Sequence, residues 1–173
     1  MIILNKEISF QHIKHNLEDF EKTIYSKSLE DTKILGIDIG KYISNGDILL
    51  LSGDLGAGKT ELVRYIVEGS GNSSFVRSPT FVLINNYVDK SNITHCDFYR
   101  IDMNTEADEL GIEEYYDNST VIIEWPEKIS HNLPKDVIII KIHFTEIENE
   151  RKFMLYSTGI KSKKFINKLK WIT

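Results

Sequence analysis

Several features that mark particular protein classes are scarce in this 173-residue sequence. Cys96 is its only cysteine, which excludes an internal disulfide and any zinc site built from several cysteines, and which suits a reducing compartment. Its aliphatic runs, of which Ile48–Leu51 is one, are far shorter than the roughly 20 residues of a membrane-spanning helix. The first residues lack the apolar core of a secretory signal. We therefore expect a cytoplasmic protein without a membrane segment or a zinc site.

Positive charge and linkers are scarce as well. A formal net charge of -5 argues against a protein that wraps nucleic acid by bulk electrostatics, so any RNA contact should be local or indirect. No stretch rich in proline, glycine and serine is long enough to separate two domains. We predict one domain over residues 28–173. Residues 1–27 form an extension before it, and the helical spacing of apolar residues between Ser9 and Phe20 predicts a docked helix there.

The remaining sequence alternates between strand-like and helix-like segments. The apolar run Ile48–Leu51, typical of a strand buried on both faces, precedes a glycine-rich loop and a segment with helical spacing. Further segments rich in β-forming residues are 93–96, 121–123, 137–142 and 153–156, and residues 161–171 have the spacing of a closing helix. These patterns predict an α/β fold of the P-loop NTPase-like, three-layer kind, with a mostly parallel central sheet and an antiparallel element near the C-terminus.

The glycine-rich loop satisfies the Walker A pattern G-x-x-x-x-G-K-[ST]. It comprises Gly53, Asp54, Leu55, Gly56, Ala57, Gly58, Lys59 and Thr60. Its glycines allow backbone N–H groups to turn inward around an anion, and the following helix presents its positive N-terminus to phosphates. Lys59 would reach the β- and γ-phosphates of ATP, and the Thr60 hydroxyl would ligate Mg²⁺. The alternative, a glycine-rich hairpin without a ligand, is disfavoured by the strand before the loop and the helix after it.

A site of this kind needs acidic side chains, because Mg²⁺ prefers oxygen ligands and the attacking water must be oriented. Glu124 ends the apolar run 121–123 and Asp97 follows 93–96, so both would lie at the C-terminal ends of strands, where α/β folds bind ligands. We predict that both act in metal binding and hydrolysis. The alternative for either is a strand-end acid that caps a helix or pairs with Arg100.

Three other features carry weaker signals. Ser78-Pro79-Thr80 could place hydroxyls near the metal or form an ordinary proline-containing turn, and the turn is the simpler interpretation. Trp125 is interpreted as a core aromatic. The histidines, His95 among them, are too scattered to suggest a zinc site, and we assign them no chemistry.

Five blocks of the sequence carry a resemblance to a known family. They are the loop at 53–60, Ser78-Pro-Thr-Phe81, His95-Cys-Asp-Phe-Tyr-Arg100, Glu109-Leu-Gly-Ile112 and Ile123-Glu-Trp-Pro126. In order and spacing the blocks, which fall within residues 28–142, resemble the TsaE family. The resemblance implies a Mg²⁺-dependent ATPase that acts on the TsaB–TsaD complex and is required for threonylcarbamoyladenosine modification of tRNA next to the anticodon. ATP hydrolysis in this family is thought to regulate or reset the complex, so tRNA is met indirectly.

The resemblance also implies roles for single residues. Lys59 matches the phosphate-binding lysine, and Thr60 and Glu124 match the Mg²⁺ ligands. Asp97 matches the acid implicated in hydrolysis. Thr32 matches a position near the nucleotide.

Two positions depart from the family pattern. Glu61, which follows the Walker threonine and belongs with the nucleotide-binding residues, stands where members usually have threonine. Its charge could weaken nucleotide affinity or alter the metal shell. Cys96 replaces a usual phenylalanine, a change that we expect to affect packing only.

Two other functions were weighed against the ATPase. A small-molecule P-loop kinase normally needs an acceptor-binding lid with arginines, and the chain has only Arg64, Arg77, Arg100 and Arg151. An RNA-binding module is suggested by the lysines between residues 161 and 170. The aromatic residue among them, Phe165, falls on the apolar side of the predicted helix and not among the lysines, so a solvated helix face is the simpler interpretation.

Overall fold

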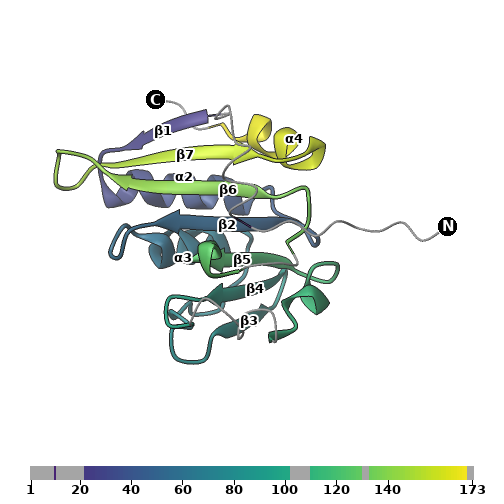
Figure 1. Ribbon diagram of the computed structural model, residues 1–173. Helices are drawn as coiled ribbons and strands as arrows, with labels where there is room; N and C mark the ends of the chain where they lie inside the picture. Colours follow the sequence, from purple (N-terminus) through teal and green to yellow (C-terminus); the bar gives the residue numbers. More distant parts are fainter. Residues whose placement is uncertain (1–9, 11–21, 102–109, 130–132, 171–173) are drawn as a thin grey trace.

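The computed structural model describes residues 10, 22–101, 110–129 and 133–170, which build one seven-stranded sheet with helices packed against it (Figure 1). The strands are β1 (Lys22–Ser26), β2 (Ile48–Gly53), β3 (Ile84–Val88), β4 (Asn92–Asp97), β5 (Thr120–Glu124), β6 (Ile138–Phe144) and β7 (Arg151–Ser157). The helices are α2 (Leu29–Gly40), α3 (Lys59–Gly69) and α4 (Ile160–Lys168), with short 3-10 helices η2 (Ile112–Tyr115) and η3 (Pro126–Lys128). The strand order is β1-β7-β6-β2-β5-β4-β3.

The centre of the sheet is parallel and its edges are antiparallel. β2 pairs in parallel with β6 and with β5, and β5 pairs in parallel with β4. The pairs β6 with β7, β7 with β1, and β4 with β3 are antiparallel. The parallel centre and the antiparallel C-terminal strands confirm those parts of the prediction. The antiparallel pair at the β3 edge was not expected, and it makes the sheet less parallel than predicted.

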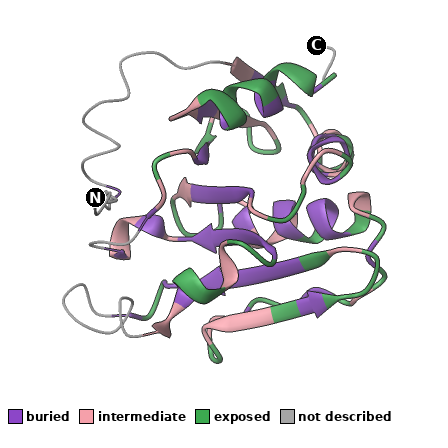
Figure 2. Ribbon diagram, turned by 90° about the vertical axis from the view of Figure 1, so that its right-hand side faces the viewer, coloured by how far each residue is buried: buried purple, intermediate pink, exposed green. Residues whose placement is uncertain are grey.

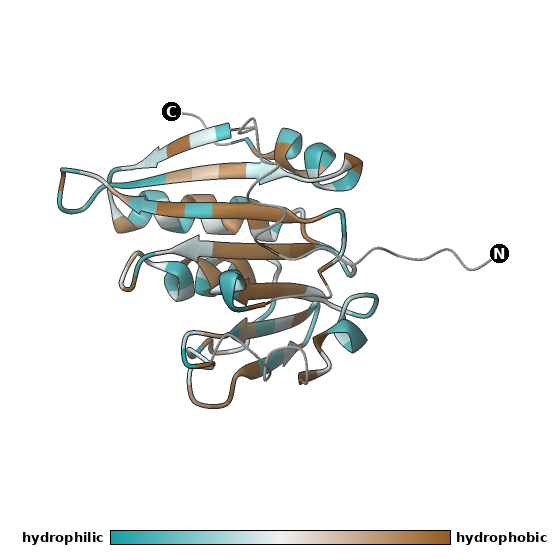
Figure 3. Cartoon of the chain, in the orientation of Figure 1, coloured by the Kyte–Doolittle hydropathy of each residue, from teal (hydrophilic) through white to brown (hydrophobic). Residues whose placement is uncertain are grey.

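The central strands consist mostly of buried apolar residues: Figure 3 colours most of β2 and β5 as hydrophobic, and Figure 2 shows buried strands in the middle of the sheet. Leu49 and Leu51 of β2 belong to a core that includes residues of α2 and α3, and Ile48 and Leu50 belong to a core on the opposite face. All four side chains are at most 3 % exposed. Burial of such a side chain contributes about 1.5–3 kcal/mol, so this short run anchors the sheet.

The two faces of the sheet are covered differently. α2, α3 and α4 all contribute to the first core, through residues such as Leu35, Ile66 and Phe165. The second core is closed by residues of loops and 3-10 helices, Phe98 and Ile112 among them. Among the described residues, α2, α3 and α4 therefore form a layer on the first face, and Phe10, whose backbone is helical, packs in the second core. The connections that follow β4 and β5 cover the second face with η2 and with residues after η3.

Close packing of α2 against α3 fixes the position of the helix that follows the glycine-rich loop. A Cβ atom added to Gly36 would lie 2.4 Å from the Cβ of Tyr65, and one added to Gly40 would lie 2.3 Å from the carbonyl oxygen of Ile66. Only glycine allows the helices to approach this closely. At the start of α2, the Ser28 hydroxyl accepts a hydrogen bond from the Asp31 N–H at 3.1 Å, an ordinary N-cap.

The two ends of the chain are described in part. Phe10 is buried in the second core, and the rest of the helix expected over Ser9–Phe20 lies outside the described residues. β1 precedes residue 28 and pairs with β7, so residues 22–26 belong to the same sheet as the rest of the domain. At the other end α4 agrees with the predicted closing helix, and Lys161 pairs with Asp47 at 2.8 Å. None of the described helices combines the length and the apolar character needed to span a membrane.

Candidate functional site

The Walker A loop joins the C-terminal end of β2 to the first turn of α3. Gly56 and Gly58 have φ values of 78° and 105°, a left-handed region that disfavours other residues. A Cβ atom at either position would meet nothing within 4 Å, so backbone conformation and not space requires glycine there. A hydrogen bond of 3.1 Å from the Ala57 N–H to the Asp54 carbonyl closes a turn within the loop.

Lys59 folds back over this loop. Its Nζ donates to the carbonyl oxygens of Gly53 at 2.7 Å and Asp54 at 2.9 Å, and it lies 3.8 Å from the centroid of the Trp125 ring. The residue is only 5 % exposed. Burial lowers the pKa of the Lys59 ammonium below its usual value, and acidic neighbours, Glu124 first among them, oppose this shift. The acceptors of the ammonium are thus two neutral carbonyl oxygens. Phosphate oxygens, which are charged and therefore stronger acceptors, could replace them.

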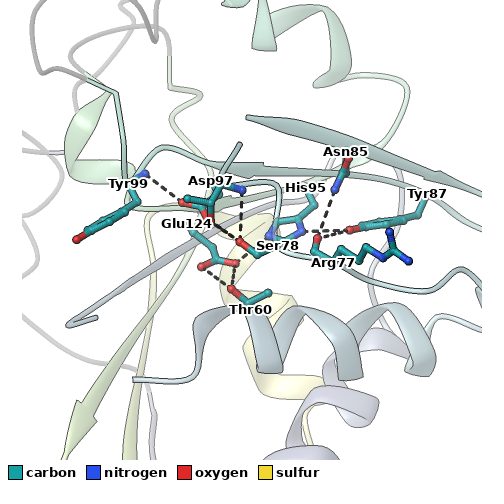
Figure 4. A network of polar contacts seen from close by, with 10 residues as sticks. Thr60, Arg77, Ser78, Asn85, Tyr87, His95, Asp97, Tyr99 and Glu124 are labelled. Atoms are coloured by element: carbon teal, nitrogen blue, oxygen red, sulfur yellow. Dashed lines mark hydrogen bonds and ion pairs between the residues drawn. The ribbon is translucent and has the colours of Figure 1, made fainter. Parts of the chain in front are cut away.

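Glu124 lies at the last position of β5 with its carboxylate turned toward α3 (Figure 4). The Thr60 hydroxyl donates to this carboxylate, 2.8 Å from Oε1 and 3.1 Å from Oε2. His95 Nε2 lies 2.9 Å from Oε1. Glu124 is 2 % exposed, so nearly all of its polar contacts are with protein. The two residues predicted to ligate Mg²⁺ are therefore in direct contact.

Asp97 ends β4 beside Glu124, because the parallel register pairs these two positions. The hydroxyls of Ser78 (3.0 Å) and Thr80 donate to its Oδ2, and the Tyr99 N–H donates to Oδ1 at 3.0 Å. The Ser78-Pro79-Thr80 segment thus forms a turn that also reaches the site, through Asp97. The alternative pairing of Asp97 with Arg100 is not seen, since the Arg100 guanidinium lies over the Phe81 ring at 4.1 Å.

These side chains line one cavity of about 370 Å³. It is bounded by Leu55, Gly56, Gly58, Lys59, Thr60, Glu61, Ser78, Thr80, Asp97, Tyr99, Glu124 and Trp125. The carboxyl ends of β4 and β5 line it through Asp97 and Glu124, and the N-terminus of α3 lines it through Lys59, Thr60 and Glu61. The predicted phosphate, metal and hydrolysis residues therefore converge on one space, with Gly53 and Asp54 behind Lys59.

A second cavity, of about 500 Å³, adjoins the first and shares Gly56, Gly58 and Glu61 with it. Thr32 lines this second space together with Arg151. Thr32, which was expected near the nucleotide, thus lies beside the Walker A loop and away from the acids. Its hydroxyl is 2.7 Å from that of Ser26, and the Arg151 Nε donates to the Ala57 carbonyl at 3.3 Å. Ala57 also borders this second cavity.

Glu61 lines both cavities, but its carboxylate is paired with another residue of α3. It forms an ion pair with Arg64 one turn further on. Burial, assisted by a hydrogen bond to Glu61, raises the pKa of Tyr65 to about 12. The charge of Glu61 is therefore partly compensated within the helix.

The oxygen atoms in the first cavity suit a hard divalent cation. A hydroxyl and a carboxylate lie side by side at Thr60 and Glu124, with the Asp97 carboxylate nearby. This set fits Mg²⁺, which binds proteins through one or two such ligands and completes its shell with phosphate and water. Within the described ranges, no three His, Cys, Asp or Glu side chains gather closely enough to hold a metal ion alone.

Comparison with known proteins agrees with this geometry. The family model described as "Threonylcarbamoyl adenosine biosynthesis protein TsaE" matches residues 26–153. The chain belongs to the TsaE family. Curated members from Bacillus subtilis and Aquifex aeolicus, both named tRNA threonylcarbamoyladenosine biosynthesis protein TsaE, are similar to it. The Bacillus subtilis protein is 36 % identical over an alignment that covers 75 % of this chain and 82 % of the relative. The Aquifex aeolicus protein is 34 % identical over an alignment that covers 78 % of this chain and 96 % of the relative.

A solved structure also resembles the chain. The crystal structure of Bacillus subtilis YdiB superposes with a TM-score of 0.75 at 28 % identity, covering 86 % of this chain and 93 % of its own. Four of the five TsaE sequence blocks are described in full, and the 53–60, Ser78–Phe81, His95–Arg100 and Ile123–Pro126 blocks each supply a residue to the first cavity. Glu109 of the remaining block lies outside the described residues.

Sequence reasoning missed three residues of this TsaE-family site. Trp125, interpreted as a core aromatic, does pack against the second core, but with φ of 59° it leaves the strand and also lines the cavity under Lys59. His95 contacts Glu124, and its place two residues before Asp97, on the same strand face, was the available signal. Arg151 of β7 donates to the Ala57 carbonyl of the loop, a contact that no local sequence pattern predicts.

The charge of Glu61 gives a testable effect on nucleotide affinity. We expect Glu61→Gln to tighten ATP binding about fivefold, because a negative charge at the cavity boundary repels phosphates by about 1 kcal/mol in a partly solvated site. Titration calorimetry at low ionic strength measures the change. Glu68→Gln, on an exposed turn of the same helix, is the matched control and should leave the affinity unchanged. An unaltered Kd in the Glu61 variant would show that Arg64 compensates its charge fully.

Proposed function

We propose that this chain is a Mg²⁺-dependent ATPase of the P-loop NTPase type, required for threonylcarbamoyladenosine modification of tRNA. One observation carries the ATPase proposal: Lys59, Thr60, Asp97 and Glu124 converge on a single cavity beside the Walker A loop. The second cavity, which continues past Gly56 and Gly58, offers room for the nucleoside end of ATP. The phosphates would then lie between the loop and the acids.

Each polar residue has a distinct task in this proposal. Lys59 exchanges its carbonyl acceptors for the β- and γ-phosphate oxygens, where its charge stabilises the transition state. Thr60 and Glu124 would hold Mg²⁺, which supplies charge neutralisation at the phosphates when bound. Asp97, fixed by three donors, retains acceptor capacity and orients the attacking water.

The pathway is proposed from the family. The relatives are named for biosynthesis of threonylcarbamoyladenosine in tRNA, and we infer that this chain serves the same pathway in the cytoplasm. It would act as an accessory protein on the TsaB–TsaD complex and meet tRNA only through that complex. The net charge of -5 supports an indirect contact with tRNA.

The kinase alternative gains no support from the cavity. Its lining contains no arginine to hold a second substrate. Arg64 pairs with Glu61, and Arg77 lies 5.4 Å from the Phe75 ring. A hydrolytic role is therefore favoured over transfer to a small-molecule acceptor.

Two substitutions test the ATPase proposal. Lys59→Ala should weaken ATP binding about 100-fold, because it removes charged hydrogen bonds that contribute about 1.5–3 kcal/mol each. Glu124→Gln, which keeps the size of the side chain, should bind ATP but lose Mg²⁺-dependent hydrolysis by at least about 100-fold. Phosphate release without an added acceptor is the assay, with and without the partner proteins. Undiminished turnover in the Glu124 variant would refute its metal role, and release only with an acceptor would favour a kinase.

The pathway is tested in cells. Depletion of the protein should remove threonylcarbamoyladenosine from tRNA, as measured by mass spectrometry of nucleosides. The wild-type chain should restore the modification, and Glu124→Ala should not. Rescue by the Glu124 variant would separate the pathway from the ATP site, and unchanged modification on depletion would refute the pathway.

A further inference from the structure

A buried histidine contacts the proposed metal ligand at the same carboxylate oxygen as Thr60. His95 is fully buried, at 0 % exposure, and its Nε2 is 2.9 Å from Glu124 Oε1. The same oxygen accepts from the Thr60 hydroxyl. Because an ionised carboxylate can only accept, Nε2 carries the hydrogen of the contact with Glu124. Glu124 is thus held between two donors from different elements, β4 and α3.

The other ring nitrogen of His95 is also engaged. Nδ1 lies 3.4 Å from the hydroxyl oxygen of Tyr87, which is 3.1 Å from the carbonyl oxygen of Arg77, so the single hydrogen of this hydroxyl has two acceptors within reach (Figure 4). Asn85 contacts the same carbonyl at 3.3 Å. A row of polar contacts therefore runs from Thr60 through the buried carboxylate to the backbone just before Ser78.

Strand geometry explains why His95 lies beside Glu124. His95 and Asp97 occupy alternate positions of β4, so their side chains leave the same face of the sheet. β5 pairs with β4 on one side and carries Glu124, and β3 pairs on the other side and carries Tyr87. Three hydrogen-bonded strands thus fix this row of side chains, which is more precise than a loop would allow.

We propose that His95 is a positioning residue that holds the Glu124 carboxylate against Thr60 before the metal binds, with Tyr87 anchoring the imidazole to the backbone at Arg77. A glutamate side chain loses rotamer freedom when it binds a metal, and a carboxylate that is already fixed loses less. The inference rests on the proposed function, since it assigns His95 a role toward the metal of that site.

The test measures metal affinity and nucleotide affinity separately. The probe is Mn²⁺, whose binding to the protein saturated with ADP is followed by electron paramagnetic resonance. Affinity for ADP is measured in parallel with a chelator and no metal. His95→Leu removes the donor, His95→Gln keeps an amide N–H near the place of Nε2, and Tyr87→Phe keeps the ring but removes the hydroxyl. Cys96→Ala, at the neighbouring position on the opposite face of β4, is the matched control.

We expect His95→Leu to weaken Mn²⁺ binding about tenfold or more, a typical effect of losing a partner that orients a metal ligand. Metal-free ADP affinity should stay within about twofold, because the histidine does not line the phosphate cavity. His95→Gln should recover most of the loss. Tyr87→Phe should weaken Mn²⁺ binding about threefold, as expected for one neutral hydrogen bond.

Three results would overturn the inference. One is wild-type Mn²⁺ affinity in a folded His95→Leu protein, and another is a glutamine variant as weak as the leucine variant. If thermal unfolding shows that the leucine variant does not fold, Tyr87→Phe decides, and unchanged Mn²⁺ affinity in it is the third. A wild-type protein that binds no Mn²⁺–ADP would instead overturn the proposed function, and the role of His95 with it.

Discussion

Parallel pairing of β2, β5 and β4 is the constraint on which the site depends. Leu51 of β2 pairs with Glu124, and Glu124 pairs with Asp97, so the three strands end at the same edge of the sheet. The Walker A loop leaves β2 at that edge. A register shift of one residue would turn Glu124 to the other face, away from Thr60. The buried apolar residues on both faces hold this register, and core packing thereby sets the geometry of the polar site.

The polar site holds charged side chains that are almost entirely shielded from water. Lys59 and Glu124 are both nearly buried, and each is satisfied by protein groups, the lysine by loop carbonyls and the glutamate by Thr60 and His95. Hydrogen bonds to charged groups are stronger in such surroundings, and an unpaired charge is costly. A bound triphosphate with its metal would replace the lysine's acceptors by stronger ones. The site can therefore accept an anion at Lys59, and in the free protein both charged side chains already have hydrogen-bond partners.

Much of this site could be predicted from the sequence because its signals are local. The Walker A loop, the strand before it and the helix after it occupy one continuous segment, and Asp97 and Glu124 each end an apolar run. The contacts of His95 and Arg151 could not be predicted, because they depend on which strands are neighbours in the sheet. β1 and β3 are edge strands whose polar residues give weak periodicity. The place of Trp125 in the cavity wall could not be predicted, because its left-handed backbone ends the alternation of β5.

A crystal structure of the protein with Mg²⁺ and a non-hydrolysable ATP analogue tests the central claim most directly. The phosphates should lie within residues 53–60, with Lys59 Nζ moved from the carbonyls of Gly53 and Asp54 to the β- and γ-phosphate oxygens. The metal should contact the Thr60 hydroxyl beside Glu124, and the nucleoside should enter the cavity lined by Thr32. An analogue bound elsewhere, or a lysine still on the loop carbonyls at full occupancy of the nucleotide, would contradict the proposed ATP site.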